Sequence, residues 1–149
     1  MARLPRSVLP LAGIYHVTSR GVARQRIYRD DDDRQLFVSL LRLATHRWRW
    51  QLFAYCLMPN HFHLVVASNL DRLSRGLHLL NFRYAQAFND RHNRVGPLSQ
   101  GRFSARVIET DEYFAAACEY VLDNPIRAGL CADRDDWPWL GGELLAGLR

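Results

Sequence analysis

The chain has 149 residues, of which 48% are hydrophobic and 23% charged, a size and balance typical of one soluble globular domain. No apolar run approaches the roughly 18 residues needed to cross a bilayer, which argues against an integral membrane protein. The net charge is +5 and all 20 basic residues are arginine. A GC-rich genome would also favour arginine codons, but the basic excess indicates an anionic partner such as nucleic acid.

The N-terminal segment and the cysteines indicate where the protein resides. Residues 3–11 only weakly resemble a secretory signal, because the apolar stretch is short and Pro10 interrupts it. The three cysteines form no C-x-x-C pair, which argues against a disulfide framework and a zinc ribbon. We therefore expect a cytoplasmic protein made of one domain, 1–149, with its core at about 14–139.

The first half of the chain predicts a strand, a helix and a hairpin. Residues 14–19 have strand character, and an arginine-rich loop follows them. Four aspartates open a helix that reaches about residue 47, because acidic groups in a first turn complement the helix dipole and apolar residues then recur at helical spacing. Apolar segments 50–58 and 61–68, separated only by Pro59 and Asn60, predict two strands joined by a tight turn.

The second half predicts a helix, a strand and a further helix. Residues 70–93 carry a continuous apolar stripe with the arginines off it, as in an amphipathic helix, and residues 95–97 break it. We expect a strand at 103–108 and a helix from Asp111 to about Asp123, ending near Pro125. The remaining tail is expected to wrap the domain as a C-terminal extension.

This order of elements indicates an α+β fold of the ferredoxin-like, split βαβ kind. It predicts a central antiparallel sheet with helices on one face, followed by a further helix and the C-terminal extension. The other face of the sheet would stay free for a ligand. RNA-recognition domains share this architecture, so the fold alone does not decide the chemistry.

His61 and His63 open the third predicted strand. Side chains at i and i+2 point to the same face of a strand, with Cα atoms about 6.5 Å apart, so the two imidazoles could share one divalent metal. Phe62 would then point into the core. An H-x-H pair alone is more often two ordinary histidines, but its place directly after the Pro59–Asn60 turn favours a metal site.

Tyr120 and Asn124 are four residues apart on the last predicted helix and so share one face. A protonated phenol is a poor nucleophile, with a pKa of about 10, but a nearby metal would polarise a phosphate under attack. Spacing alone equally allows a packed tyrosine and a C-cap asparagine. Tyr113 is an equally qualified phenol, although alanine stands four residues after it.

Four blocks occur in order: YHVTSRG at 15–21, MPNHFHLVV at 58–66, GRF at 101–103 and EYVLDNPIRAGL at 119–130. Together they resemble the REP-associated tyrosine transposases, which are single-domain, HUH-type relatives of the smallest insertion-sequence transposases. The resemblance covers residues 14–139. One position departs from it: Ser99 stands where similar sequences often have tryptophan, which bears on DNA contacts around Gly101.

The resemblance implies a catalytic role for the helix that carries Tyr120. Tyr120 would cleave single-stranded DNA, forming a covalent 5′-phosphotyrosine and freeing a 3′-hydroxyl, and attack by a 3′-hydroxyl would rejoin or transfer the strand. His61 and His63 would be metal ligands, with Asn124 the third. Such ligands suit Mg²⁺ or Mn²⁺, and Zn²⁺ would also fit two histidines.

The resemblance also implies a DNA partner. Similar proteins recognise hairpins formed by repetitive extragenic palindromes (REPs), next to a short single-stranded guide sequence. By position and charge, the candidate DNA-binding residues are Arg20, Arg24, Arg83 and Arg102. Related transposases include monomers and homodimers that exchange the tyrosine helix, so the sequence leaves the oligomeric state open.

Two other functions remain open at this stage. A catalytically inactive hairpin-binding module would keep the fold, although the intact Tyr120, histidine and Asn124 set argues against it. A metal-dependent hydrolase would use the histidines to activate water. It would turn over repeatedly and leave no DNA linked to the protein.

Overall fold

The computed structural model describes residues 13–146, so the signal-like segment 3–11 lies outside the described residues. No helix among the described residues is long and apolar enough to span a bilayer. The elements, in chain order, are β1 (Gly13–Arg20), η1 (Val22–Arg24), α1 (Asp31–Arg47), β2 (Gln51–Met58), β3 (His61–Ser68), α2 (Leu70–Arg91), β4 (Ser104–Val107), α3 (Asp111–Arg127), η2 (Arg134–Asp136), β5 (Leu140–Gly141) and α4 (Glu143–Ala146).

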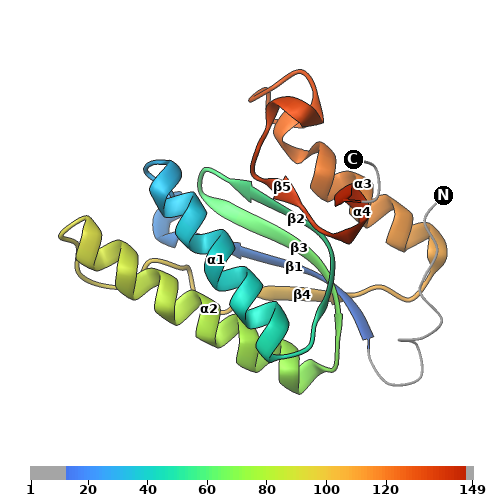
Figure 1. Cartoon of the computed structure of the whole chain (residues 1–149), viewed down its shortest axis with the longest axis horizontal. Helices are drawn as coiled ribbons and strands as arrows, with labels where there is room; N and C mark the ends of the chain where they lie inside the picture. Colours follow the sequence, from blue (N-terminus) through green and yellow to red (C-terminus); the bar gives the residue numbers. More distant parts are fainter. Residues whose placement is uncertain (1–12, 147–149) are drawn as a thin grey trace.

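The strands form one antiparallel sheet in the order β4-β1-β3-β2-β5. The first four strands and the helices between them reproduce the predicted split βαβ arrangement (Figure 1). The β2–β3 hairpin turns within Pro59 and Asn60. β5, contributed by the C-terminal extension, adds one short strand beyond β2.

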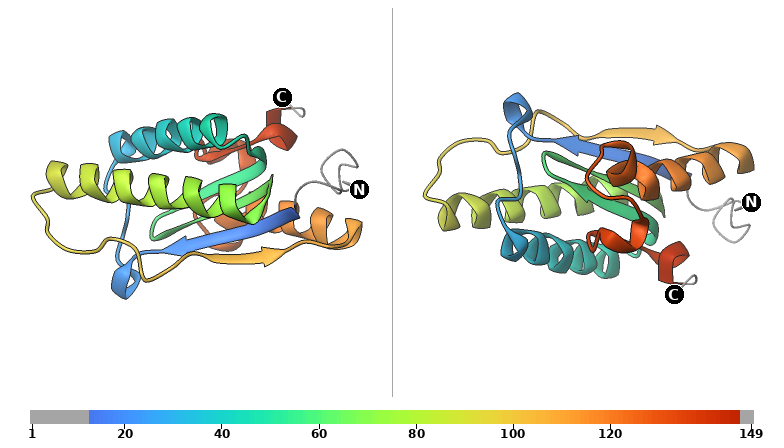
Figure 2. Two further views of the ribbon diagram at one scale, coloured as in Figure 1. Left: turned by 90° about the horizontal axis from the view of Figure 1, so that it is seen from below. Right: turned by 90° about the horizontal axis from the view of Figure 1, so that it is seen from above.

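Helices α1 and α2 lie side by side on one face of the sheet (Figure 2). Their apolar stripes, with Phe37 on α1 and Leu77 on α2, pack against Phe62 and Leu64 of β3. All four side chains are at most 1% exposed. This layer is the main core, and it matches the face predicted to carry the helices.

The opposite face of the sheet is not free, contrary to the sequence-based expectation. Helix α3 packs across part of it, burying Phe114 and Val121 against Cys56 and Val65. Figure 2 shows α3 on the side of the sheet away from α1 and α2. The physical reason is that β2 and β3 are apolar on both faces over much of their length, which requires cover on both sides. Only the end of this face that carries polar side chains remains open.

The end of α3 also differs from the prediction. The helix continues to Arg127 with Pro125 inside it, whereas a stop near Asp123 was expected. Proline removes only its own N–H from the helix ladder, and Ala128 N–H still donates to Asn124 at 3.0 Å. The extra turn places Arg127 seven residues after Tyr120, on the same helix face.

The C-terminal extension wraps the domain, as predicted, and the structure shows that it follows the β2 edge. The indole of Trp137 donates to the Leu57 carbonyl at 3.0 Å, and Leu57 N–H donates to the Trp139 carbonyl at 3.0 Å. Leu140 is 4% exposed and joins the core beneath α3. The extension therefore caps one edge of the sheet.

Candidate active site

The polar end of the α3 face brings β1 and β3 together. In the β1–β3 register, Thr18 lies opposite His63 and Arg20 lies opposite His61. Phe62, between the two histidines, is 1% exposed in the core on the far side. The predicted alternation along β3 is therefore present, with both imidazoles on one face.

Tyr120 on α3 lies beside these histidines. Its ring centroid is 5.6 Å from that of His63 and 5.9 Å from that of His16, and both contacts are edge-on. Its side chain is 47% exposed, so a substrate can reach the phenol. Tyr113 lines the same cavity, but only Tyr120 among the described tyrosines has a ring contact with these histidines. The geometry thus favours Tyr120 over Tyr113.

Hydrogen bonds orient both imidazoles of the H-x-H pair. His61 Nδ1 lies 2.6 Å from the Asn60 amide oxygen, which can only accept, so Nδ1 carries the proton. His63 Nδ1 lies 3.0 Å from His16 Nε2 and 3.1 Å from Thr18 Oγ1. In each ring Nδ1 is engaged, which leaves Nε2 as the nitrogen available to a ligand. Partners of this kind typically orient metal-binding histidines.

Both imidazoles are held in their neutral form. Burial, with a smaller contribution from the positive charge of Arg20, lowers the pKa of His61 to about 4. Burial lowers the pKa of His63 to about 3, with a smaller contribution from neighbouring His61. Neutral imidazole is the form that binds a metal ion.

The remaining donor is an amide. Asn124 is 9% exposed, and its Nδ2 atom is buried without a hydrogen-bond partner. That nitrogen is a hydrogen-bond donor, so only the amide oxygen of Asn124 can bind a cation. Among residues 13–146 no three His, Cys, Asp or Glu side chains converge on a common metal position. Two neutral imidazoles fit a divalent cation that keeps positions open for substrate oxygens, with the Asn124 amide oxygen as the candidate third ligand.

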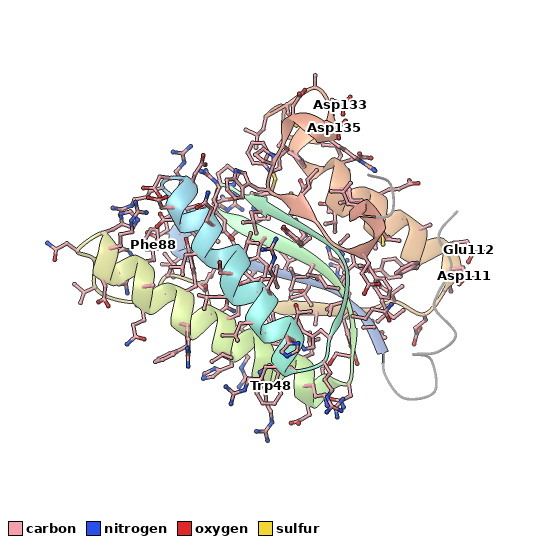
Figure 3. All side chains as sticks on the ribbon, viewed as in Figure 1. Trp48, Phe88, Asp111, Glu112, Asp133 and Asp135 are labelled. Carbon is pink, nitrogen blue, oxygen red and sulfur yellow. The ribbon has the colours of Figure 1, made fainter. Side chains whose placement is uncertain are left out.

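The cavity lined by His16, His63 and Tyr120 is strongly basic. It has a volume of about 760 Å³, and the charged side chains that line it are Arg20, Arg102 and Arg106, with no carboxylate. Asp111 and Glu112 lie at the start of α3, and Asp133 and Asp135 lie beyond its other end (Figure 3). Such a cavity favours a polyanion such as DNA.

The four predicted DNA-binding arginines do not all gather here. Arg20 and Arg102 line the cavity. Arg24 is exposed in η1, beside the β2–β3 turn, where its carbonyl accepts from Asn60 Nδ2 at 3.3 Å. Arg83 is exposed on α2, which covers the opposite face of the sheet. The structure thus separates Arg83 from the Tyr120 site.

Three further side chains belong to the site although the sequence reasoning gave them no role. The Arg127 guanidinium lies over the Tyr120 ring, 4.0 Å from its centroid, and donates to the Tyr120 carbonyl. Arg127 is seven residues after Tyr120 and so shares its helix face, but the helix predicted from the sequence ended before Arg127. His16 and Arg106 are paired across β1 and β4. His16 stood in a motif block, but its contact with His63 depends on strand pairing.

Comparison with known proteins now identifies the family. Residues 12–124 match the family model described as "Transposase IS200 like", a match that spans most of the chain and includes Tyr120 and both histidines. The chain belongs to the IS200-like transposase family. This agrees with the resemblance drawn from the four sequence blocks.

Individual relatives support this assignment. A Haemophilus influenzae protein named as a REP-associated tyrosine transposase is 23% identical over 138 residues, covering 85% of this chain and 78% of the relative. The structure of a REP-associated tyrosine transposase bound to a REP hairpin has a TM-score of 0.74 and 17% identity, covering 94% of this chain and 82% of that one. A Deinococcus radiodurans structure described as a transposase has a TM-score of 0.54 and 16% identity, covering 82% of this chain and 96% of that one.

Proposed function

We propose that this transposase cleaves and rejoins single-stranded DNA next to hairpins, with Tyr120 as the nucleophile. The observation that carries the proposal is the position of the Tyr120 phenol, which is exposed and edge-on to His63 in a cavity lined by arginine. One relative of the same fold is described as bound to a REP hairpin, which supports a hairpin as the DNA partner here. We keep both a monomer and a homodimer as possible assemblies.

Cleavage and rejoining would be two phosphoryl transfers, each the reverse of the other. The Tyr120 oxygen forms a bond to the scissile phosphorus and loses its proton. The bond to the 3′ oxygen breaks, and that oxygen gains a proton. The product is a 5′-phosphotyrosine and a free 3′-hydroxyl, and attack by a 3′-hydroxyl reverses the exchange. No water or nucleotide cofactor is consumed.

The chain's own residues would position and stabilise this exchange. Arg127 holds the Tyr120 ring through the stacked guanidinium. Arg20, Arg102 and Arg106 neutralise phosphates that enter the cavity. His61, His63 and Asn124 would hold Mg²⁺ or Mn²⁺, which when bound would supply positive charge to the phosphate under attack.

Tyr120→Phe tests the nucleophile. The experiment incubates labelled single-stranded DNA carrying a REP-type hairpin from the protein's own genome with Mn²⁺ or Mg²⁺, and resolves the products under denaturing conditions. The wild type should give a protein-linked DNA band that EDTA abolishes. Tyr120→Phe should bind the DNA with unchanged affinity and give no such band, because the attacking oxygen is missing.

Tyr113→Phe is the matched control, since Tyr113 lines the same cavity. It should form the adduct as the wild type does. Loss of the adduct in Tyr113→Phe but not in Tyr120→Phe would overturn the assignment. Binding without cleavage by the wild type would favour the inactive hairpin-binding module, and repeated cleavage with both DNA ends free would indicate a hydrolase.

A further inference from the structure

A second hollow lies on the other side of strand β4 from the Tyr120 cavity. We call it the α2–β4 groove. It has a volume of about 780 Å³, and its lining includes His78, Asn81 and Phe82 from α2 together with Ser99, Arg102 and Ala105 from the β4 side. β4 is the edge strand of the sheet on this side (Figure 1). The groove is therefore open to solvent along a strand edge.

The groove contains a flat aromatic surface. Phe82 is 60% exposed, and its ring stacks with that of His78, with centroids 6.3 Å apart and planes 14° apart. A single exposed apolar side chain is ordinary on a protein surface. Two parallel rings in a hollow are different, because they present a face on which another planar group can stack. Neither ring belongs to the buried core.

The groove adjoins the Tyr120 cavity. Arg102 lines both hollows. Along β4, Ser104 and Arg106 face the Tyr120 cavity, whereas Ala105 faces the groove, as expected from the alternation of side chains along a strand. The two hollows therefore lie on opposite sides of β4, and Arg102 lines both.

The charge of both hollows favours an anionic occupant. Arg102 is the charged side chain in the lining of the groove, it lines the cavity together with Arg20 and Arg106, and no carboxylate lines either hollow. A lipid or an apolar peptide would pack on the aromatic rings but would give the arginines no anionic partner. A single DNA strand satisfies both, since its phosphates pair with arginine and its bases stack on aromatic rings.

We propose that the α2–β4 groove binds an unpaired base of the DNA strand whose phosphate lies in the Tyr120 cavity. The base stacks on Phe82 and His78, while Arg102 binds the phosphate that joins the two sites. Asn81 and Ser99 offer hydrogen-bonding groups to the edge of the base. This inference rests on the proposed single-stranded DNA substrate, and it adds a base-binding subsite on the face opposite to the catalytic residues.

The test compares two fluorescent probes of equal length and charge, a short oligothymidylate and a strand of abasic deoxyribose phosphates. Binding is measured by anisotropy in the Tyr120→Phe background, which prevents cleavage. Oligothymidylate should bind more tightly than the abasic strand. Phe82→Ala should weaken oligothymidylate binding about tenfold, as expected for the loss of one stacked base, and should leave abasic binding unchanged.

Two further variants make the result specific. Phe82→Trp keeps a stacking surface and should bind as tightly as the parent. Leu43→Ala removes a similarly exposed apolar side chain from α1 and should change neither probe. Equal oligothymidylate affinity in Phe82→Ala and Leu43→Ala would overturn the subsite, as would equal weakening of both probes in Phe82→Ala.

Failure of this subsite can be separated from failure of the proposed function. Adduct formation by the protein with an intact Tyr120 tests the function, whereas the probe comparison tests the groove. An adduct together with unchanged oligothymidylate binding in Phe82→Ala would refute only the groove. Phe82-dependent base binding without any adduct would support the groove and refute Tyr120 as the nucleophile.

Discussion

The contacts of Tyr120 bear on its proposed role as the nucleophile. The Arg127 guanidinium lies over the face of the ring, and the His16 and His63 imidazoles contact the ring edge-on. Arginine stacks on an aromatic face and keeps its charge at every accessible pH. Arg127 is therefore placed to hold the phenol in one orientation and to favour negative charge that develops near it.

Replacing Arg127 should slow chemistry more than binding. Arg127→Ala is expected to reduce the single-turnover rate of adduct formation by about 100-fold, the scale observed when one preorganised charge-stabilising donor is lost. Hairpin affinity should remain nearly unchanged. Arg127→Lys should recover only part of the rate, because lysine keeps the charge but not the planar stack. A wild-type rate of adduct formation in Arg127→Ala would show that Arg127 does not contribute to the reaction.

The hydrogen bond between His16 and His63 should tune metal binding. His16→Ala removes one partner of His63 Nδ1 and leaves Thr18 as the other. The concentration of Mn²⁺ needed for half-maximal adduct formation should rise about tenfold, which is typical when a residue that orients a metal ligand is lost. The rate at saturating Mn²⁺ should recover toward wild type. An unchanged metal titration would contradict this role.

At the scale of elements, an acidic cluster joins the start of α1 to the end of α2. Arg91 donates to Asp30 at 2.5 Å and to Asp33 at 2.7 Å, and His92 Nε2 lies 2.7 Å from Asp33. Asp33 is 1% exposed. The cluster fixes the two helices at one end, so that their apolar stripes meet the sheet in register.

The cluster predicts an acid-sensitive contribution to stability. The hydrogen bond from Arg91 is the largest cause that lowers the pKa of Asp30 from 3.8 to about 2. A lowered native pKa stabilises the fold above the unfolded value, and this contribution is lost as the pH falls through about 4 to 2. Asp30→Asn keeps an N-cap, so the stability difference between wild type and variant should shrink over that range. Urea unfolding at several pH values measures it, and a constant difference would refute it.

At the scale of the whole molecule, two helical layers leave only one end of the sheet open. The layer of α1 and α2 forms the main core, and α3 with the C-terminal extension forms a second one. The extension also pairs with β2, which would otherwise be a sheet edge. Unpaired edges promote association between sheets, so the extension protects the domain.

Removing the extension should therefore impair the whole domain. A variant that ends at Asp136 loses the Trp137 hydrogen bond, the β5 pairing and the buried Leu140 side chain. It should melt at a lower temperature and form soluble oligomers or aggregates, which calorimetry and light scattering would detect. A monodisperse variant with unchanged melting would show that the extension does not protect the β2 edge.

The sequence by itself determined the ferredoxin-like order of strands and helices, because hydrophobic periodicity is local. It also placed His61 and His63 on one face, and it identified Tyr120 and Asn124 by spacing and by family resemblance. The catalytic and metal-binding roles of these residues, and the DNA contacts of the arginines, stay predictions.

Only the tertiary structure decided which face α3 covers, that His16 and Arg106 join the site, and that Arg83 lies away from it. These facts depend on strand register and on the crossing of α3 over the sheet. Both are set by contacts between residues far apart in the chain, which no local pattern encodes.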